Sequence, residues 1–212
     1  MNIPLAPIEV NIIITCFDKE EYREGLMQCI NEYKFITPNI CLCYNGEMDV
    51  FPCDLKMENQ GHQLGDISMT LAGYKYFKGN GVNRFLKIGI DSWILDDKVI
   101  YQIFRSLEAS QSSYAGNYWF AENTPSLATD IIFADITHGN IFEAFEWDGV
   151  YFETSLFNTV VKNNLKISFI TERVPIDPLN RFKCDKLNWV MEHDLKKNFE
   201  YYWKYKNYLN NQ

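Results

Sequence analysis

The sequence predicts an α/β fold in which helices alternate with the strands of a mostly parallel sheet. Four apolar runs of strand length in the first half of the chain alternate with three segments whose apolar residues repeat at helical spacing. The 212 residues suffice for one such domain with a sizeable core, and 47% of them are hydrophobic and 16% aromatic. Regular alternation of strands and helices is the pattern of a doubly wound sheet.

The first half of the chain supplies the nucleus of this sheet. Strands are predicted at 10–16, 39–44, 54–58 and 84–91, and helices at 19–33, 65–77 and 94–109. Branched residues dominate the first strand, and Gly79-Asn80-Gly81 is a strong stop signal after the second helix. The run from Arg84 to Leu95 is apolar and carries a single carboxylate, Asp91, as expected of a buried strand with a polar end.

The second half of the chain changes character. Strands are predicted at 114–120, 130–135, 142–147 and 165–171, the last in the chain, with a helix at 152–163. A polar loop, 121–129, separates the first two of these strands and is expected to reach over the sheet. No repeat or linker interrupts the chain, so residues 1–212 are predicted to form one domain. The tail of Lys and aromatic residues, 198–209, could dock on that domain, contact a membrane surface or lead into a further domain of a longer natural protein.

Charge and cysteine content narrow the possible partners. The net charge of −8 argues against nucleic acid, which needs a basic face, and suits a site for a divalent cation. The six cysteines show neither a zinc spacing nor a dense disulfide framework, so reduced thiols in a cytoplasmic setting are expected. Met1 to Val10 does not read as a signal peptide, and no apolar run approaches about 20 residues, so a soluble or peripherally membrane-associated protein is expected.

Polar residues follow four of the predicted strands at their carboxyl ends. Ligands bind outside this edge in open α/β sheets, so the four polar ends predict a ligand crevice. Thr15 and Asp18 are expected to hydrogen-bond a base or ribose, and Asn45 to read a base edge, with capping or turn formation as the alternative for each. The candidate binding residues are Thr15, Asp18, Asn45, Asn59, Gly61, His62, Asp66, Lys87 and Ser92.

The loop from Asn59 to Asp66 opens the second predicted helix. The free amides of that helix are suited to a diphosphate, although the glycines match neither a Walker nor a dinucleotide fingerprint. His62 either touches phosphate or caps the helix. Lys87 lies inside an apolar strand, where the alternative to ligand binding is a side chain that snorkels to the sheet edge. Asp91 is the first residue to test for function, and its alternative role is a helix cap.

Four of these segments together resemble a known family. Strand 10–15, strand 40–44 ending in Asn45-Gly46, the loop Asn59-Gln60-Gly61 and the run 85–95 resemble nucleotide-sugar glycosyltransferases of the GT-A fold. The resemblance implies a single-domain, Rossmann-like α/β/α sandwich with a mostly parallel, mixed sheet. It also implies a nucleotide-sugar half, 8–97, and an acceptor half, 98–212.

The resemblance gives Asp91 a specific role. In this family an Asp-any-Asp motif ends the fourth strand and holds a divalent metal against the diphosphate of the donor. Gly89-Ile90-Asp91 stands at that position, with Gly89 in place of the first Asp. A His near the C-terminus often adds a ligand, which implies that Asp91 and His193 hold Mn²⁺ or Mg²⁺.

The resemblance also implies a general base and a reaction. Glu153, at the start of a predicted helix, stands where inverting members carry the carboxylate that deprotonates the acceptor hydroxyl, and Asp148 is the substitute candidate. The implied reaction is inverting transfer from a nucleoside diphosphate sugar, foremost a UDP-sugar, to a glycan acceptor. Two alternatives stay open. One is a nucleotidyltransferase, whose glycine-rich loop with Lys or Arg after the first strand is missing here, and the other is an inactive binding module, which Gly89 permits.

Overall fold

The computed structural model describes residues 8–17, 22–46, 53–58, 60–90, 92–94, 98–121, 124–149, 151–172 and 189–191. The elements are β1 (Ile12–Phe17), α1 (Tyr22–Lys34), β2 (Ile40–Asn45), β3 (Leu55–Met57), α2 (His62–Gly79), β4 (Arg84–Gly89), β5 (Ser92–Ile94), α3 (Lys98–Ser110), β6 (Tyr114–Ala121), β7 (Thr124–Asp135), the 3-10 turn η1 (Ile136–His138), α4 (Phe152–Lys162), β8 (Ile167–Glu172) and β9 (Trp189–Met191). None of the described helices combines the length and hydrophobicity that a membrane span requires.

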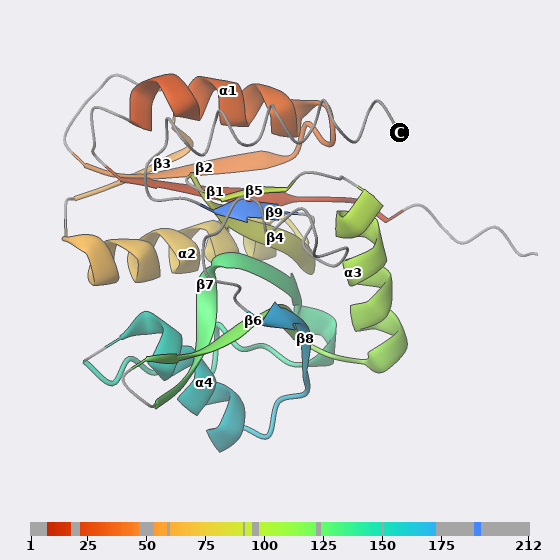
Figure 1. Ribbon diagram of the computed structural model, residues 1–212. Coiled ribbons are helices and arrows are strands. Elements are labelled where there is room, and N and C mark those ends of the chain that lie inside the picture. The colour runs from red at the N-terminus through yellow and green to blue at the C-terminus, as the bar shows by residue number, and fades with distance from the viewer. Residues whose placement is uncertain are drawn as a thin grey trace, which may run out of the picture.

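Seven strands form one sheet in the order β3-β2-β1-β4-β7-β6-β8 (Figure 1). Strand β7 runs antiparallel to both of its neighbours, and the other pairs in the sheet are parallel. A separate two-stranded sheet pairs β5 with β9 in antiparallel fashion. The predicted α/β class with a mostly parallel, mixed sheet is therefore confirmed.

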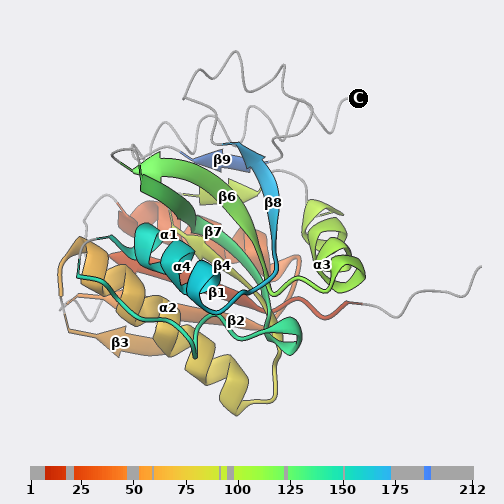
Figure 2. The same ribbon diagram turned by 90° about the horizontal axis from the view of Figure 1, so that it is seen from below.

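The helices cover both faces of the sheet. Alternation along the strands sends Ile12 and Ile14 of β1 into one core with residues of α1 and α3, while Ile13 packs with residues of α2 and α4. Figure 1 shows α1 and α2 on opposite sides of β1 and β2. In Figure 2, α2 and α4 lie in front of the strands. These layers form the predicted α/β/α sandwich.

Helix α2 approaches the sheet closely at two glycines. A Cβ atom at Gly73 would lie 2.6 Å from Cγ2 of Ile13, and one at Gly65 would clash with the amide of Asn45. Only glycine allows this distance between helix and sheet. The close contact holds the first turn of α2 against the carboxyl end of β2.

Four segments differ from the sequence prediction. Of the predicted loop 121–129, Ala121 ends β6 and residues 124–129 lie in β7, which begins at Thr124 and continues for 12 residues, so these residues do not reach over the sheet as a loop. The polar residues of this stretch are tolerated in a buried strand because their hydroxyls find partners, as Ser126 does with Thr154 at 3.0 Å. Residues 142–147 form the end of a turn and irregular backbone in place of a strand, although Phe142 is buried in the core. The run 84–95 is divided between β4 and β5, and β8 is followed by a further strand, β9.

Candidate functional site

The carboxyl ends of β1, β2 and β4 lie side by side, as the strand-end argument predicts. Phe17 pairs with Asn45, and Thr15 pairs with Gly89. Thr15 is buried between its two neighbouring strands. This edge of the parallel sheet is where an α/β protein binds its ligands.

The side chain of Asn45 fixes the loop before α2. The amide N–H of Gln60 donates to Asn45 Oδ1 at 3.2 Å, and Asn45 Nδ2 donates to the carbonyl of Gly61 at 3.4 Å. Gly61 has a φ of 77°, which favours glycine, and it offers the first turn of α2 no side-chain cap. Asn45 is 1% exposed, so in this structure its amide serves the alternative role of holding a turn.

A buried ion pair lies beside this loop. Lys87 Nζ of β4 is 2.9 Å from Asp66 Oδ1 of α2, and it donates a hydrogen bond of 2.6 Å to the carbonyl of Thr129 in β7. The lysine is buried and does not snorkel to the sheet edge. Since Ile88 pairs with Ile131, Thr129 lies further along toward the carboxyl end of β4. The pair therefore ties α2, β4 and β7 together at that end of the sheet.

Glu153 lies on the other side of Thr129. The Thr129 hydroxyl donates to Glu153 Oε1 at 3.4 Å. Glu153 Oε2 is buried and has no hydrogen-bond partner among the described residues. Glu153 is in the first turn of α4, where the helix dipole favours a negative charge. A carboxylate with one oxygen unused is suited to accept a proton or a hydrogen bond from a ligand.

The buried phenol of Tyr114 stays neutral near this carboxylate. Its hydroxyl donates to the carbonyl of Ala128 at 2.9 Å. Burial, followed by the charges of Asp130 and Glu153, raises the pKa of Tyr114 far above its ordinary value. Tyr114 therefore contributes a fixed hydrogen bond at β7 and no charge.

Asp148, the substitute base, has a different environment. The Ser155 hydroxyl donates to Asp148 Oδ1 at 2.8 Å, and Asn158 Nδ2 donates to Oδ2 at 3.4 Å. Both carboxylate oxygens thus accept hydrogen bonds from α4, and they fasten the preceding loop to that helix.

The proposed metal ligands lie outside the described residues, as do Asp18, Asn59 and the side chain of His62. Among the described residues, Ser92 of β5 pairs with Met191 of β9. In the sequence, Asp91 comes one residue before Ser92, and His193 comes two residues after Met191. Ser92 is buried, and its hydroxyl has no partner within the described part of the chain. No group of three or more His, Cys, Asp or Glu side chains that could hold a metal occurs among the described residues.

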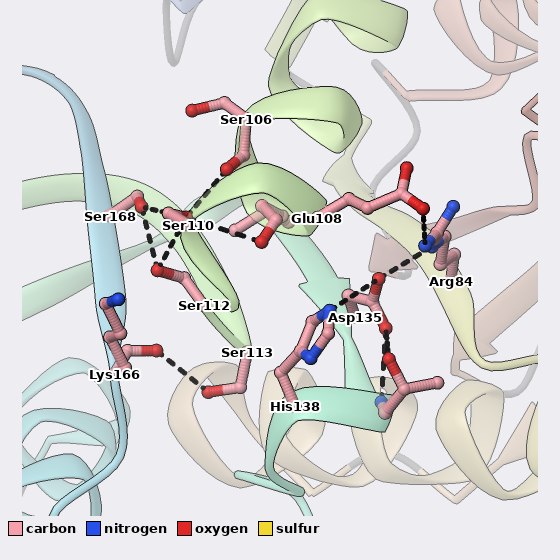
Figure 3. Close-up of polar contacts among 12 residues, drawn as sticks. Arg84, Ser106, Glu108, Ser110, Ser112, Ser113, Asp135, His138, Lys166 and Ser168 are labelled. Atoms are coloured by element: carbon pink, nitrogen blue, oxygen red, sulfur yellow. Dashed lines mark hydrogen bonds and ion pairs between the residues drawn. The ribbon is translucent and has the colours of Figure 1, made fainter. Parts of the chain in front are cut away.

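A second polar cluster, built around the buried Asp135, lies at the opposite end of β4 and was not predicted (Figure 3). Arg84 Nε donates to Asp135 Oδ2 at 2.6 Å, and the backbone N–H of Thr137 donates to Oδ1 at 3.1 Å. Burial opposes the charge of Arg84, but the hydrogen bonds and charges of Asp135 and, to a smaller extent, Glu108 together outweigh it and raise the pKa of the guanidinium. His138 Nε2 is 3.9 Å from the same carboxylate. This cluster joins the amino end of β4 to the end of β7, far along both strands from the candidate site.

Thr129 is the residue of the candidate site that the sequence did not reveal. It contacts Lys87 through its carbonyl and Glu153 through its hydroxyl, so it joins a predicted binding residue to the predicted base. Only its place in β7 makes this possible, and the sequence around it predicts a loop. Polar residues in an otherwise apolar 12-residue strand could have provided a signal, had the strand been recognised.

Comparison with known proteins gives likeness of structure only. No known family model and no curated protein matches the sequence. The fold is similar to that of a protein from Desulfovibrio desulfuricans assigned as a nucleotide-diphospho-sugar transferase, with a TM-score of 0.55, 13% identity, and coverage of 92% of this chain and 97% of that one. It is also similar to a glycosyltransferase involved in the glycosylation of the major capsid of PBCV-1, with a TM-score of 0.54, 11% identity, and coverage of 91% and 98%.

A third similar structure belongs to another class of enzyme. A Bacillus anthracis protein assigned as a glucose-1-phosphate thymidylyltransferase has a TM-score of 0.54 and 9% identity, with coverage of 90% of this chain and 94% of that one. The predicted GT-A-like, Rossmann-like fold is confirmed by these structures. At such identities the likeness establishes the fold and not the reaction.

Proposed function

We propose that this protein is a glycosyltransferase that moves a sugar from a nucleoside diphosphate donor, foremost a UDP-sugar, to a hydroxyl of a glycan acceptor. The observation that carries the proposal is Glu153, a carboxylate in the first turn of a helix with one buried oxygen unpaired among the described residues. It is connected through Thr129 to Lys87, near the carboxyl end of β4. A base candidate and the ligand edge of the sheet thus belong to one network.

The donor is proposed to lie over the carboxyl ends of β1, β2 and β4. Thr15 and Asp18 are the candidates for base or ribose contacts, and the first turn of α2 after Gly61 is suited to the diphosphate. Asn59, His62 and Ser92 complete the set of direct contacts in this proposal.

Three other candidates support the donor site through the fold. Asn45 holds the loop that opens α2, and Lys87 and Asp66 hold the first turn of that helix against β4. Their polar atoms already bond to protein groups. We therefore propose that these residues position the loop and the helix and do not contact the nucleotide directly.

Asp91 and His193 are proposed to hold a divalent cation, Mn²⁺ or Mg²⁺. The choice follows the resemblance, because Asp91 stands at the last Asp of the family's motif and His193 is the His near the C-terminus. A carboxylate and an imidazole, with oxygens of the diphosphate, are acceptable ligands for Mn²⁺. A cation bound there would neutralise charge on the leaving diphosphate.

Glu153 is proposed to remove the proton of the acceptor hydroxyl during a single displacement, which inverts the anomeric centre. Asp148 remains the substitute. It is less suited, because Ser155 and Asn158 already donate to both of its oxygens.

Measurements of nucleotide binding and of turnover distinguish this function from its alternatives. Calorimetry measures the binding of UDP with and without Mn²⁺, and assays on a panel of nucleotide sugars then measure donor hydrolysis and sugar transfer. We expect metal-dependent UDP binding that D91A removes, and turnover that E153Q lowers by roughly 10²–10⁴-fold while UDP binding remains. D148N is the matched carboxylate control and should retain turnover.

Other outcomes contradict the proposal. Near-wild-type turnover in both D91A and E153Q would exclude the assigned metal ligand and base. Consumption of a nucleoside triphosphate together with a sugar phosphate would identify a nucleotidyltransferase. The Bacillus anthracis protein of similar fold is assigned to that class of enzyme. Nucleotide binding with no turnover of any donor would identify a binding module.

A further inference from the structure

We propose that Thr129 is a positioning residue for Glu153, with Lys87 as its anchor. This inference rests on the proposed function, in which Glu153 is the base. The Thr129 hydroxyl takes up one oxygen of the carboxylate and leaves the other directed to the acceptor. The residue belongs to β7, which lies between the strand that carries Lys87 and the strand β6.

Lys87, a residue of the nucleotide-sugar half, holds the backbone of Thr129 in place. Lys87 Nζ donates to its carbonyl at 2.6 Å, a short and charge-assisted hydrogen bond. The same ammonium is 2.9 Å from Asp66 Oδ1, so its position is set by α2 as well as β4. Tyr114 holds the preceding residue, since its hydroxyl donates to the carbonyl of Ala128. Two buried side chains therefore fix the backbone at consecutive residues.

The hydroxyl of Thr129 acts on the other half of the domain. It donates to Glu153 Oε1 at 3.4 Å, which is long for a bond between a hydroxyl and a carboxylate. Catalytic hydrogen bonds are often long in ligand-free structures and shorten when the substrate is bound. Because Thr129 is β-branched, its χ1 angle is restricted, and the hydroxyl is directed with little rotational freedom.

The assignment of the two carboxylate oxygens follows from this contact. Glu153 Oε2 is buried and has no partner among the described residues, and we assign it as the oxygen that takes the proton of the acceptor. In the transfer step the acceptor oxygen bonds to the anomeric carbon, the bond from that carbon to the diphosphate oxygen breaks, and the proton of the acceptor passes to Oε2. The diphosphate leaves with the electron pair of the broken bond. A carboxylate free to rotate would present this oxygen less often.

A second contact between β7 and α4 provides a matched control. Ser126 and Thr154 share a buried hydrogen bond at 3.0 Å that joins the same two elements, whereas the bond from Thr129 to Glu153 is half-buried. Ser126 does not touch Glu153 in any contact that the structure describes. A change at Ser126 therefore measures how the loss of a contact between β7 and α4 affects turnover when the contact to Glu153 is kept.

The test measures steady-state transfer by the full chain with Thr129→Val, Thr129→Ser and Ser126→Ala. Valine keeps the volume and strand preference of threonine and removes the hydroxyl. We expect T129V to lower kcat roughly tenfold, as for a lost hydrogen bond to a charged group, with an unchanged KM for the donor. T129S should restore kcat close to wild type, and S126A should leave it near wild type.

The double variant T129V/E153Q shows whether Thr129 acts through the carboxylate. In the E153Q background, T129V should cause no further loss of kcat, because the group it positions has been removed. If T129V does not fold, as judged by circular dichroism and UDP binding, T129A removes the same hydroxyl and takes its place.

The outcomes distinguish this inference from the proposed function. Three outcomes would overturn the role of Thr129 and leave sugar transfer by the wild type standing. They are a wild-type kcat in T129V, a tenfold loss of kcat in S126A as well as in T129V, and a further loss of kcat in the double variant. If the wild type transfers no sugar from any donor, the proposed function fails, and the positioning role fails with it.

Discussion

The substitution Asp66→Asn tests the buried ion pair at the candidate site. Lys87 Nζ lies 2.9 Å from Asp66 Oδ1, and the two side chains are 2% and 13% exposed. At an effective dielectric constant of about 20, two unit charges at this distance attract by about 6 kcal/mol, and most of this offsets their removal from water. D66N removes the attraction but leaves the ammonium buried. Breaking such a pair from one side costs about 3–5 kcal/mol of unfolding free energy.

The lower end of that range, about 3 kcal/mol, is the expected loss for D66N, because the asparagine oxygen and the Thr129 carbonyl still accept hydrogen bonds. For a chain of this length the melting temperature should fall by roughly 6–12 °C. Lys87→Met should cost less than D66N, since it leaves behind the more exposed member of the pair.

Urea unfolding with a constant m-value provides the measurement. The control is the double variant D66L/K87M, which replaces both charges by apolar groups and should be more stable than D66N alone. A loss below about 1 kcal/mol in D66N would refute this account of Lys87. So would a double variant whose loss equals the sum of the two single losses.

Two further predictions concern other buried groups of the fold. Arg84→Met leaves the buried carboxylate of Asp135 without its guanidinium partner and should lower the unfolding free energy by about 3 kcal/mol. In contrast, Lys162→Met breaks an exposed pair and should change it by less than about 1 kcal/mol, and equal losses in urea titrations would contradict the assigned role of burial. The raised pKa of Tyr114 predicts alkaline unfolding: its contribution is present below the ordinary pKa of about 10 and is lost at higher pH, by up to about 1.4 kcal/mol per pH unit. Stability measured against pH should lose this dependence in Tyr114→Phe but keep it in the control Tyr76→Phe, and an unchanged slope in Tyr114→Phe would reject the assignment.

The first half of the fold could be predicted because its signals are local. Branched apolar runs mark β1, β2 and β4, and helical spacing of apolar residues marks α1 and α2. The second half was harder to predict, because tertiary contacts override local preference there. Polar residues such as Ser126 and Thr129 predict a loop from the sequence alone, but the stretch pairs with β6 as a strand and both hydroxyls bond to α4. The division of 84–95 into β4 and β5 depends on the distant segment 189–191, which no local pattern predicts.

In the candidate site, too, single residues could be predicted from the sequence but their contacts could not. Lys87, Asp66 and Glu153 were each candidates from their places in the sequence, and the structure brings them into one network. The residue that joins them, Thr129, was not a candidate. Asn45 lies at the carboxyl edge of the sheet, as predicted, but its burial and its two hydrogen bonds could not be read from the sequence.

The sequence by itself determined the α/β class, the central parallel strands and the edge where their polar ends meet. Hydrophobic periodicity and strand ends are properties of neighbouring residues, so they can be read along the chain. Only the tertiary structure decided which polar groups pair with one another. Lys87 is separated from Thr129 by 42 residues, and Thr129 from Glu153 by 24, and such contacts depend on how strands and helices pack. The partner that each buried charge finds in three dimensions decides whether it binds a ligand, holds the fold or remains available for chemistry.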